Sequence, residues 1–178
     1  MLQTIPILSH LPSFSFFQFR QLQPRPLESL NRTNPVGIAV AMNFETTVVW
    51  AERFPGKLHC QNGQAIDYSP PTELEGMFGP LSPEDAFVGS ANMCYQIVFE
   101  YISRDLGLKL VEYKCRAVGD LEVVDGVKKF IKITLYPELK FASGSKMTNL
   151  DKAITTTKRK CLVTNSMDLE LEVVPKVL

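Results

Sequence analysis

The fold is decided by the stretch LSPEDAFVGSANMCYQIVFEYISRDLGL at residues 81–108, which predicts one long helix. Ser82 is a favoured N-cap residue, and Pro83 suits the first helical position, where its missing N–H costs nothing. Gly107 can adopt the left-handed conformation that ends a helix. Apolar residues recur at helical spacing between these ends. We therefore expect a long, largely buried helix from Ser82 to Leu108, wrapped by the rest of the domain.

The segments on both sides of this helix have strand patterns. Three short β-branched or aromatic runs precede it, with turn residues between them, at 46–50, 57–61 and 64–68. Their turns are predicted at Pro55-Gly56 and Asn62-Gly63.

Two longer runs follow the helix, at 109–124 and 127–141, and Asp125-Gly126 between them is a strong hairpin signal. A second helix is predicted from Asn149 towards Cys161, and an alternating strand at 168–174. This order predicts an α+β domain in which antiparallel sheets wrap around the central helix.

Composition limits the class of protein. The chain has 178 residues, of which 45% are hydrophobic, and no net charge, which suits one domain with a substantial core. It has no basic run for nucleic acid, and prolines interrupt its longest uncharged stretch, at residues 1–19. The four cysteines lie far apart without a Cys-x-x-Cys pair, so neither a metal site nor a disulfide scaffold is predicted. We expect a cytoplasmic protein that binds neither nucleic acid nor membranes.

Residues 1–41 differ in composition from the rest. They are rich in Leu, Pro, Ser and Phe, and their first acidic residue is Glu28. Three interpretations stay open for this N-terminal extension: a disordered segment, a targeting leader, or an upstream stretch before a natural start at Met42. The globular domain is predicted at 42–178.

A resemblance to a known family rests on the spacing of particular residues. The run Ser82-Pro83-Glu84-Asp85 is followed by Cys94, ten residues after Glu84, and a second cysteine, Cys161, follows a late helix. This arrangement, with the loop at residues 70–76, resembles the OsmC/Ohr family of organic hydroperoxide reductases. The resemblance covers 42–178, and it implies an OsmC-like fold and an intertwined homodimer with active sites at its interface.

The resemblance also implies roles for individual residues. Cys94 corresponds to the peroxidatic cysteine and Cys161 to the resolving cysteine, while Glu84 and Arg53 correspond to the glutamate and arginine of the family's site. The family usually has Cys-Pro-x-Ser at the second cysteine, where this chain has Cys161-Leu162-Val163-Thr164. The implied function is a thiol-dependent peroxidase for organic or lipid hydroperoxides in oxidative-stress defence. It would need no bound cofactor and would be regenerated by an external dithiol, such as a lipoyl group, or by a small thiol.

The chemistry requires these residue types. A thiolate attacks the O–O bond, and a buried cysteine needs a cation to offset the cost of its charge. Arg53 can bind both a thiolate and a carboxylate, so Glu84 would hold Arg53 in place. Ten helical residues advance about 15 Å, so Glu84 and Cys94 cannot touch in one straight helix. We expect a bridging arginine or a second subunit to join them.

Five apolar residues form a predicted pocket for the alkyl part of a hydroperoxide: Phe54, Met77, Phe78, Phe87 and Met93. Each can instead belong to core or loop packing, just as Cys94 can be a structural cysteine and Glu84 a simple helix-start charge. Two other functions stay open. One is a non-catalytic OsmC-like ligand-binding protein. The other is a hot-dog thioesterase in which Glu84 or Asp85 activates water.

Overall fold

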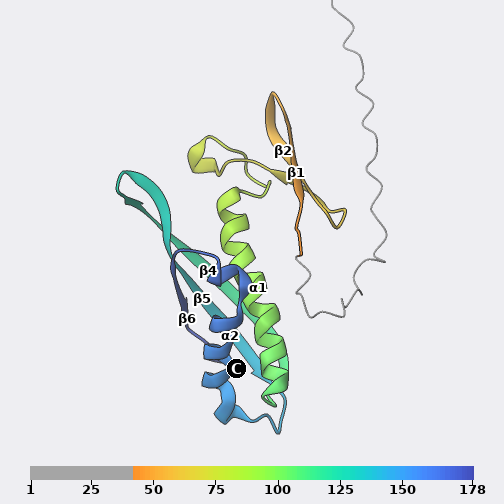
Figure 1. Ribbon diagram of the computed structural model, residues 1–178, viewed down its shortest axis with the longest axis vertical. Helices are drawn as coiled ribbons and strands as arrows, with labels where there is room; N and C mark the ends of the chain where they lie inside the picture. Colours follow the sequence, from red (N-terminus) through yellow and green to blue (C-terminus); the bar gives the residue numbers. More distant parts are fainter. Residues whose placement is uncertain (1–41) are drawn as a thin grey trace, which may run out of the picture.

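The structure is a computed structural model that describes residues 42–178, so the predictions for residues 1–41 lie outside the described residues. Within the described residues, the 3-10 turns Thr72–Leu74 and Met147–Asn149 accompany the helices and strands (Figure 1). The other elements, in order, are β1 (Thr46–Ala51), β2 (Arg53–Cys60), β3 (Ala65–Tyr68), α1 (Pro83–Asp105), β4 (Leu110–Val124), β5 (Val127–Phe141), α2 (Leu150–Lys160), α3 (Leu162–Asn165), β6 (Glu170–Val173) and β7 (Lys176–Val177).

Helix α1 begins as the sequence predicts. The Ser82 hydroxyl accepts a hydrogen bond from the backbone N–H of Asp85 at 3.0 Å and donates one to the Asp85 carboxylate at 2.9 Å. Pro83 occupies the first turn. At the other end the helix stops at Asp105, and Gly107 has the predicted left-handed conformation, with a φ of 75°.

The larger sheet contains β4, β5, β6 and β7. Strands β4 and β5 are antiparallel, and Asp125 and Gly126 both have positive φ in the two-residue turn between them, as predicted. Strands β6 and β7 pair with β5 in parallel, so the expectation of purely antiparallel sheets was wrong for this part. The connection between β5 and β6 explains the parallel pairing. Helices α2 and α3 return the chain along the sheet before β6 begins, and a crossover of this kind joins parallel strands.

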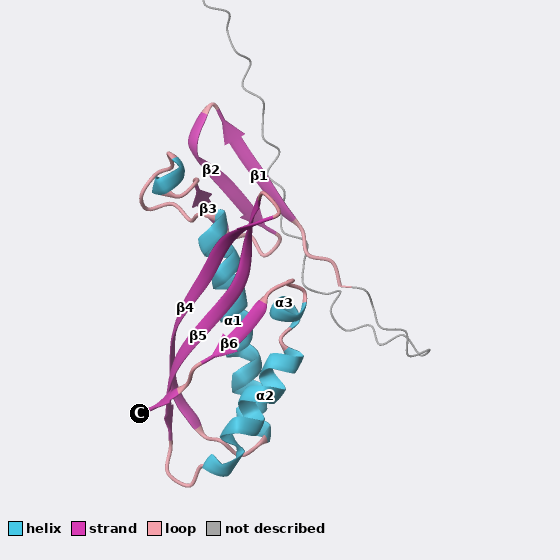
Figure 2. Cartoon of the chain, turned by 90° about the vertical axis from the view of Figure 1, so that its left-hand side faces the viewer, coloured by secondary structure: helices cyan, strands magenta, loops and turns pink. Residues whose placement is uncertain are grey.

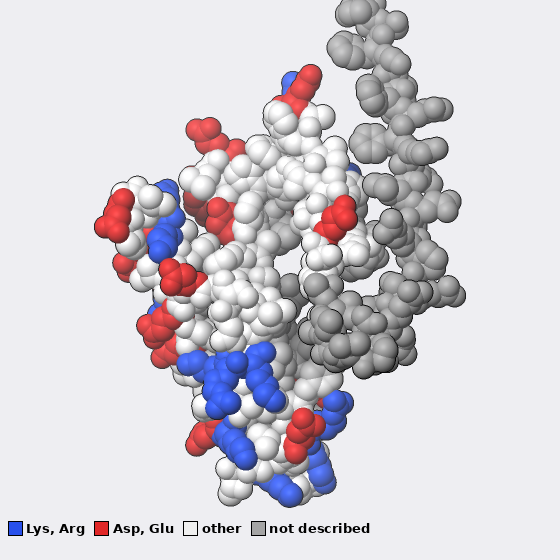
Figure 3. Space-filling view, viewed as in Figure 1, with Lys and Arg blue, Asp and Glu red and all other residues white. Residues whose placement is uncertain are grey.

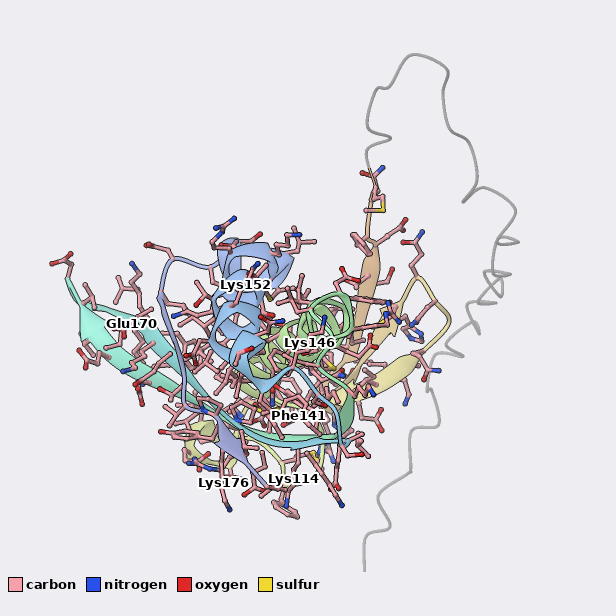
Figure 4. The ribbon with its side chains drawn as sticks, turned by 90° about the horizontal axis from the view of Figure 1, so that it is seen from below. Lys114, Phe141, Lys146, Lys152, Glu170 and Lys176 are labelled. Atoms are coloured by element: carbon pink, nitrogen blue, oxygen red, sulfur yellow. The ribbon has the colours of Figure 1, made fainter. Side chains whose placement is uncertain are left out.

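Helices α1 and α2 cover one face of this sheet (Figure 2). Lys114 and Lys176 extend from the opposite face, whereas Lys146 and Lys152 lie on the helical side (Figure 4). The Asn149 side chain donates a hydrogen bond to the Leu106 carbonyl at 2.7 Å, which ties the start of α2 to the end of α1. The buried core between the helices and the sheet is made of Ala91, Tyr95, Phe99, Ile102, Leu108, Ile133, Leu135, Leu139, Ala153 and Cys161.

The smaller sheet is the meander β1–β2–β3, which lies beyond the N-terminal end of α1 (Figure 1). The Asn62-Gly63 turn is confirmed, with a φ of 89° at Gly63. The predicted Pro55-Gly56 turn was wrong, because both residues lie within β2 and the chain reverses at Glu52, whose φ is 60°. Gly56 has a packing role instead: the Tyr68 ring occupies the space that a Cβ atom at Gly56 would fill.

Two apolar surfaces within residues 42–178 are exposed. The first, the meander face, is one side of the smaller sheet, with exposed Val48, Trp50, Phe54 and Ile66. The second, the helix stripe, lies on α1 at a spacing of four residues, with exposed Met93, Ile97 and Tyr101. Within one chain, α1 is therefore buried along one side only, whereas we expected it to be wrapped.

Candidate active site

The two cysteines singled out in the sequence meet at the contact between α1 and α3. Cys94 lies in the middle of α1 and is half-buried, whereas Cys161 lies between α2 and α3 and has no exposed surface. The Cys161 thiol lies close enough to Cys94 to raise the pKa of the Cys94 thiol. All four cysteines are free thiols. The site therefore contains a partly exposed cysteine next to a buried one.

Opposing influences act on the Cys94 thiol. Burial raises the pKa of Cys94 above its ordinary value of 9.0, and a backbone hydrogen bond from Val163 lowers it. The Cys161 thiol raises the pKa further, while a backbone hydrogen bond from Leu162 again lowers it. Burial is the largest of these influences, so within one chain the Cys94 thiol is held in its protonated form to a higher pH than usual.

Hydrogen bonds fix the backbone around Cys161. Its N–H donates to the Thr157 carbonyl at 2.9 Å. The Asn165 amide donates to the Cys161 carbonyl at 2.6 Å, and to the carbonyls of Lys158 and Arg159 at 3.2 Å each. Asn165 thus joins the last turn of α2 to α3. The sequence does not mark this residue as part of the site, because an asparagine four residues after a cysteine carries no recognisable signal.

A basic cluster immediately precedes Cys161. It consists of Lys158, Arg159 and Lys160 in the last turn of α2, where positive charge interacts favourably with the helix dipole. Lys and Arg side chains gather over this part of the molecule (Figure 3).

A third thiol and two tyrosines lie behind the pair. Burial raises the pKa of Cys115, and its thiol donates to the Arg116 carbonyl at 3.5 Å. Burial also raises the pKa of Tyr95, as do the nearby Cys115 and Cys161 thiols. Among the described residues, the buried hydroxyls of Tyr95 and Tyr113 have no hydrogen-bond partner. The polar side chains next to the two cysteines are therefore only partly hydrogen-bonded.

The orphaned hydroxyl of Tyr95 leads to a prediction about stability. Tyr95→Phe is expected to raise the free energy of unfolding by about 1 kcal/mol, because the desolvation cost of a buried, unpaired hydroxyl disappears while the ring is kept. Urea denaturation followed by circular dichroism would measure the change. Tyr101→Phe is the control, because that side chain is half exposed, and it should leave the midpoint unchanged. A lower midpoint for Tyr95→Phe would contradict the prediction.

Glu84 lies in the first turn of α1, and one of its carboxylate oxygens, Oε2, is buried without a hydrogen-bond partner among the described residues. Glu84 is not among the groups that shift the pKa of Cys94, in agreement with their predicted separation along the helix. Asp85, in contrast, acts as a capping residue, because its backbone N–H and its carboxylate both form hydrogen bonds with the Ser82 hydroxyl.

Arg53 is exposed at the start of β2, next to the reversal at Glu52. Its hairpin lies at the N-terminal end of α1, whereas α2 lies alongside the other half of that helix (Figure 1). Among the described residues, no ion pair joins Arg53 to Glu84, and Arg53 does not influence the pKa of Cys94. One chain therefore does not bring Arg53 to the cysteines.

The five apolar residues of the predicted pocket lie in different environments. Phe87 stacks on Phe130 at a centroid distance of 4.9 Å, and Phe54 packs against Trp50 and Tyr68. Phe78 is 95% exposed, and Met77 and Met93 are also exposed. Within one chain these residues do not line a common pocket.

A groove in the described part of the chain lies elsewhere. It runs between β3 and the loop before α1 and contains neither cysteine; its lining residues are Ala65, Ile66, Asp67, Gly79, Pro80 and Leu81. The described residues include no cluster of three or more His, Cys, Asp or Glu side chains suited to a metal. Within 42–178, none of the helices has the length and apolarity needed to span a bilayer.

Comparisons with known proteins place this geometry in a family. The sequence profile of the family described as OsmC-like protein matches residues 78–175. A search of curated proteins found no match.

Several solved structures share the fold. An OsmC-like protein of unknown function from Vibrio cholerae O1 biovar eltor is 22% identical with a TM-score of 0.70, and the comparison covers 78% of this chain and 100% of that one. An organic hydroperoxide resistance protein from Elizabethkingia anophelis is 16% identical with a TM-score of 0.61, over 77% and 96% of the two chains. The organic hydroperoxide resistance protein OhrB of Bacillus subtilis is 13% identical with a TM-score of 0.56, over 77% and 98%.

At these identities the similarity to solved structures shows the fold alone, and the predicted OsmC-like α+β fold is confirmed. The profile match is independent of that comparison and includes both Cys94 and Cys161. Because it spans more than half of the 178 residues, the chain belongs to the OsmC-like family.

Proposed function

We propose that this protein is a thiol-dependent peroxidase that reduces organic or lipid hydroperoxides and contributes to oxidative-stress defence. The observation that carries the proposal is the contact between a half-buried Cys94 and a fully buried Cys161. Membership of a family with relatives named organic hydroperoxide resistance proteins supports it.

The reaction consumes two thiols for each peroxide. The Cys94 thiolate attacks one oxygen of the hydroperoxide, the O–O bond breaks, and the alcohol leaves with a proton while Cys94 becomes a sulfenic acid. The Cys161 sulfur then attacks the Cys94 sulfur, water leaves, and a disulfide forms. An external dithiol, such as a lipoyl group, or a small thiol reduces this disulfide and is itself oxidised. We place this chemistry in the cytoplasm, where thiols are kept reduced.

The proposal includes a homodimer. The meander face and the helix stripe are two apolar surfaces that one chain leaves uncovered, and a second copy would bury both. Burial by a second copy would also let Glu84 and Arg53 complete the site of the neighbouring chain. The unpaired Glu84 oxygen supports this arrangement, because a guanidinium would satisfy it and also offset the burial of Cys94.

The same association would assemble the alkyl-binding surface. Met93 lies one residue before Cys94 on the exposed side of α1, and Met77 and Phe78 are exposed in the loop before that helix. A second copy can bring such side chains from two chains together over the sulfur. In the proposed dimer, Phe54, Met77, Phe78, Phe87 and Met93 would bind or support the alkyl group of the substrate.

A stoichiometry experiment tests the proposed function. Reduced protein is mixed with cumene hydroperoxide, and the remaining peroxide and free thiols are both counted. We expect one peroxide consumed for every two thiols lost, and repeated turnover when dihydrolipoamide is added. Consumption of peroxide without loss of thiols would contradict the mechanism.

The alternatives predict different outcomes of the same assay. A non-catalytic ligand-binding protein would consume no peroxide; the departure from Cys-Pro-x-Ser after Cys161 is the observation that favours this second candidate. A thioesterase would cleave acyl-coenzyme A without loss of thiols, and the contact between the two cysteines has no purpose in that reaction.

A further inference from the structure

An asparagine of α1 is hydrogen-bonded to the edge strand of the larger sheet. The Asn92 amide donates to the backbone carbonyl of Cys115 in β4 at 3.2 Å. One turn earlier in the helix, Val88 lies directly over Gly119 of the same strand, where a Cβ atom would be only 2.6 Å from a Val88 methyl carbon. Helix α1 is therefore held against β4 at two successive turns of one flank.

The Cys115 carbonyl points away from the rest of the sheet. Cys115 pairs with Pro137 of β5, and the carbonyls two residues to either side of Pro137 accept hydrogen bonds from the N–H groups that directly follow β6 and β7. Residues two apart in a strand direct their carbonyls to the same side, so Pro137 faces β6 and β7 while the Cys115 carbonyl faces the open edge of β4. Asn92 supplies a partner that no strand within the described residues provides.

We infer that Asn92 is a positioning residue for Cys94, because its hydrogen bond fixes the rotation of α1 about its own axis. Two residues of a helix turn a side chain by about 200°, so Asn92 and Cys94 lie on opposite flanks, with buried Ala91 and Tyr95 between them. Helix α1 also contacts α3, and Cys94 packs against the core cluster that contains Cys161. The inference rests on the proposed function, because it concerns the pairing of Cys94 with Cys161.

A small rotation of α1 would change the distance between the two sulfurs. Side-chain atoms lie about 5 Å from the helix axis, so a rotation of about 20° moves the Cys94 sulfur by about 2 Å. A disulfide forms only within a narrow range of distances and torsion angles. Without the Asn92 hydrogen bond, α1 is less constrained in rotation, and the sulfurs of Cys94 and Cys161 adopt the geometry of a disulfide less often.

The equilibrium between the dithiol and disulfide forms of the protein tests this role. The protein is incubated with mixtures of reduced and oxidised dithiothreitol, and mass spectrometry of alkylated peptides counts the chains with a Cys94–Cys161 disulfide. The two protein thiols lose two electrons and two protons, which oxidised dithiothreitol gains. Asn92→Ala should lower the equilibrium constant for the disulfide about tenfold, because the two thiols are less well oriented toward each other.

Gln96→Ala is the matched control. Gln96 lies one turn further along α1, and among the described residues its amide forms no side-chain hydrogen bond. This variant should keep the wild-type equilibrium constant. An unchanged constant in Asn92→Ala would overturn the inference even if the variant unfolds more easily, because a loss of stability common to both redox states leaves the constant unchanged. An equal decrease in Gln96→Ala would overturn it as well.

If circular dichroism shows that Asn92→Ala is misfolded, Asn92→Asp replaces it, because aspartate has the same size and carries no amide donor. The redox equilibrium requires no peroxide. A lower constant in the Asn92 variant of a protein that consumes no peroxide would therefore reject the peroxidase and keep the role of Asn92. Normal peroxide turnover with an unchanged constant would do the opposite. A wild-type chain that forms no Cys94–Cys161 disulfide would also overturn the inference.

Discussion

Replacing Cys94 with serine is expected to reduce peroxide consumption to the uncatalysed rate. A serine hydroxyl stays protonated at neutral pH and is a poor nucleophile for the O–O bond, whereas a thiolate attacks it readily. Cys161→Ser should have a different effect, because Cys94 is still oxidised but no neighbouring sulfur condenses with it. We expect that variant to consume one peroxide per chain and to accumulate a sulfenic acid that dimedone traps on the peptide containing Cys94.

The remaining cysteines provide matched controls for this experiment. Cys60 lies in the meander and Cys115 in β4, and neither influences the pKa of the Cys94 thiol. Cys60→Ser and Cys115→Ser should therefore turn over peroxide at the wild-type rate. Full activity in Cys94→Ser would reject the assignment of the peroxidatic cysteine. A trappable sulfenic acid on any other cysteine would reassign it.

Replacing Ile97 with aspartate is expected to dissociate the proposed dimer. Ile97 lies at the middle of the helix stripe and is 51% exposed within one chain, so a carboxylate at this position keeps much of its hydration in the isolated chain. Between two copies, the same carboxylate would lose its hydration without a partner, which costs several kcal/mol for each unpaired charge. Sedimentation velocity at micromolar concentration should show a dimer for the wild type and a monomer for Ile97→Asp.

Thr155→Asp is the control for the dimer experiment. It adds the same charge at an exposed position on α2, outside the helix stripe and the meander face. It should therefore leave sedimentation unchanged. A wild-type chain that sediments as a monomer, or an Ile97→Asp variant that stays dimeric, would contradict the proposed interface.

Local sequence signals predicted the elements that depend on neighbouring residues. The cap at Ser82, the end at Gly107 and the turn at Asp125-Gly126 are all decided within a few residues, and all three are confirmed. The parallel pairing of β6 was not predicted, because it depends on the path of α2 and α3 across the sheet. The Pro55-Gly56 error has a similar origin, since only the distant Tyr68 ring explains a glycine inside β2.

The candidate site likewise has some features that the sequence predicted and others that only the fold reveals. The resemblance drew attention to Cys94 and Cys161, but their contact depends on the packing of α3 against α1, which no spacing in the sequence reveals. The sequence marked the residue after Cys161 as a departure from the family pattern, and only the fold shows that this residue begins α3 directly after a fully buried cysteine. The roles of Glu84 and Arg53 stay predictions, since each depends on surfaces that one chain leaves open.

In the proposed peroxidase, the complete burial of Cys161 would determine which sulfur of the oxidised protein an incoming reductant can reach. Thiol–disulfide exchange requires a thiolate to approach one sulfur along the S–S axis while the other sulfur departs. Of the two cysteines, only Cys94 is partly exposed, so in the proposed peroxidase the reductant would become covalently attached to Cys94, and Cys161 would be the leaving group. The buried sulfur of Cys161 would thus give the proposed regeneration step a fixed regiochemistry, and a reductant would have to be slender enough to reach the middle of α1.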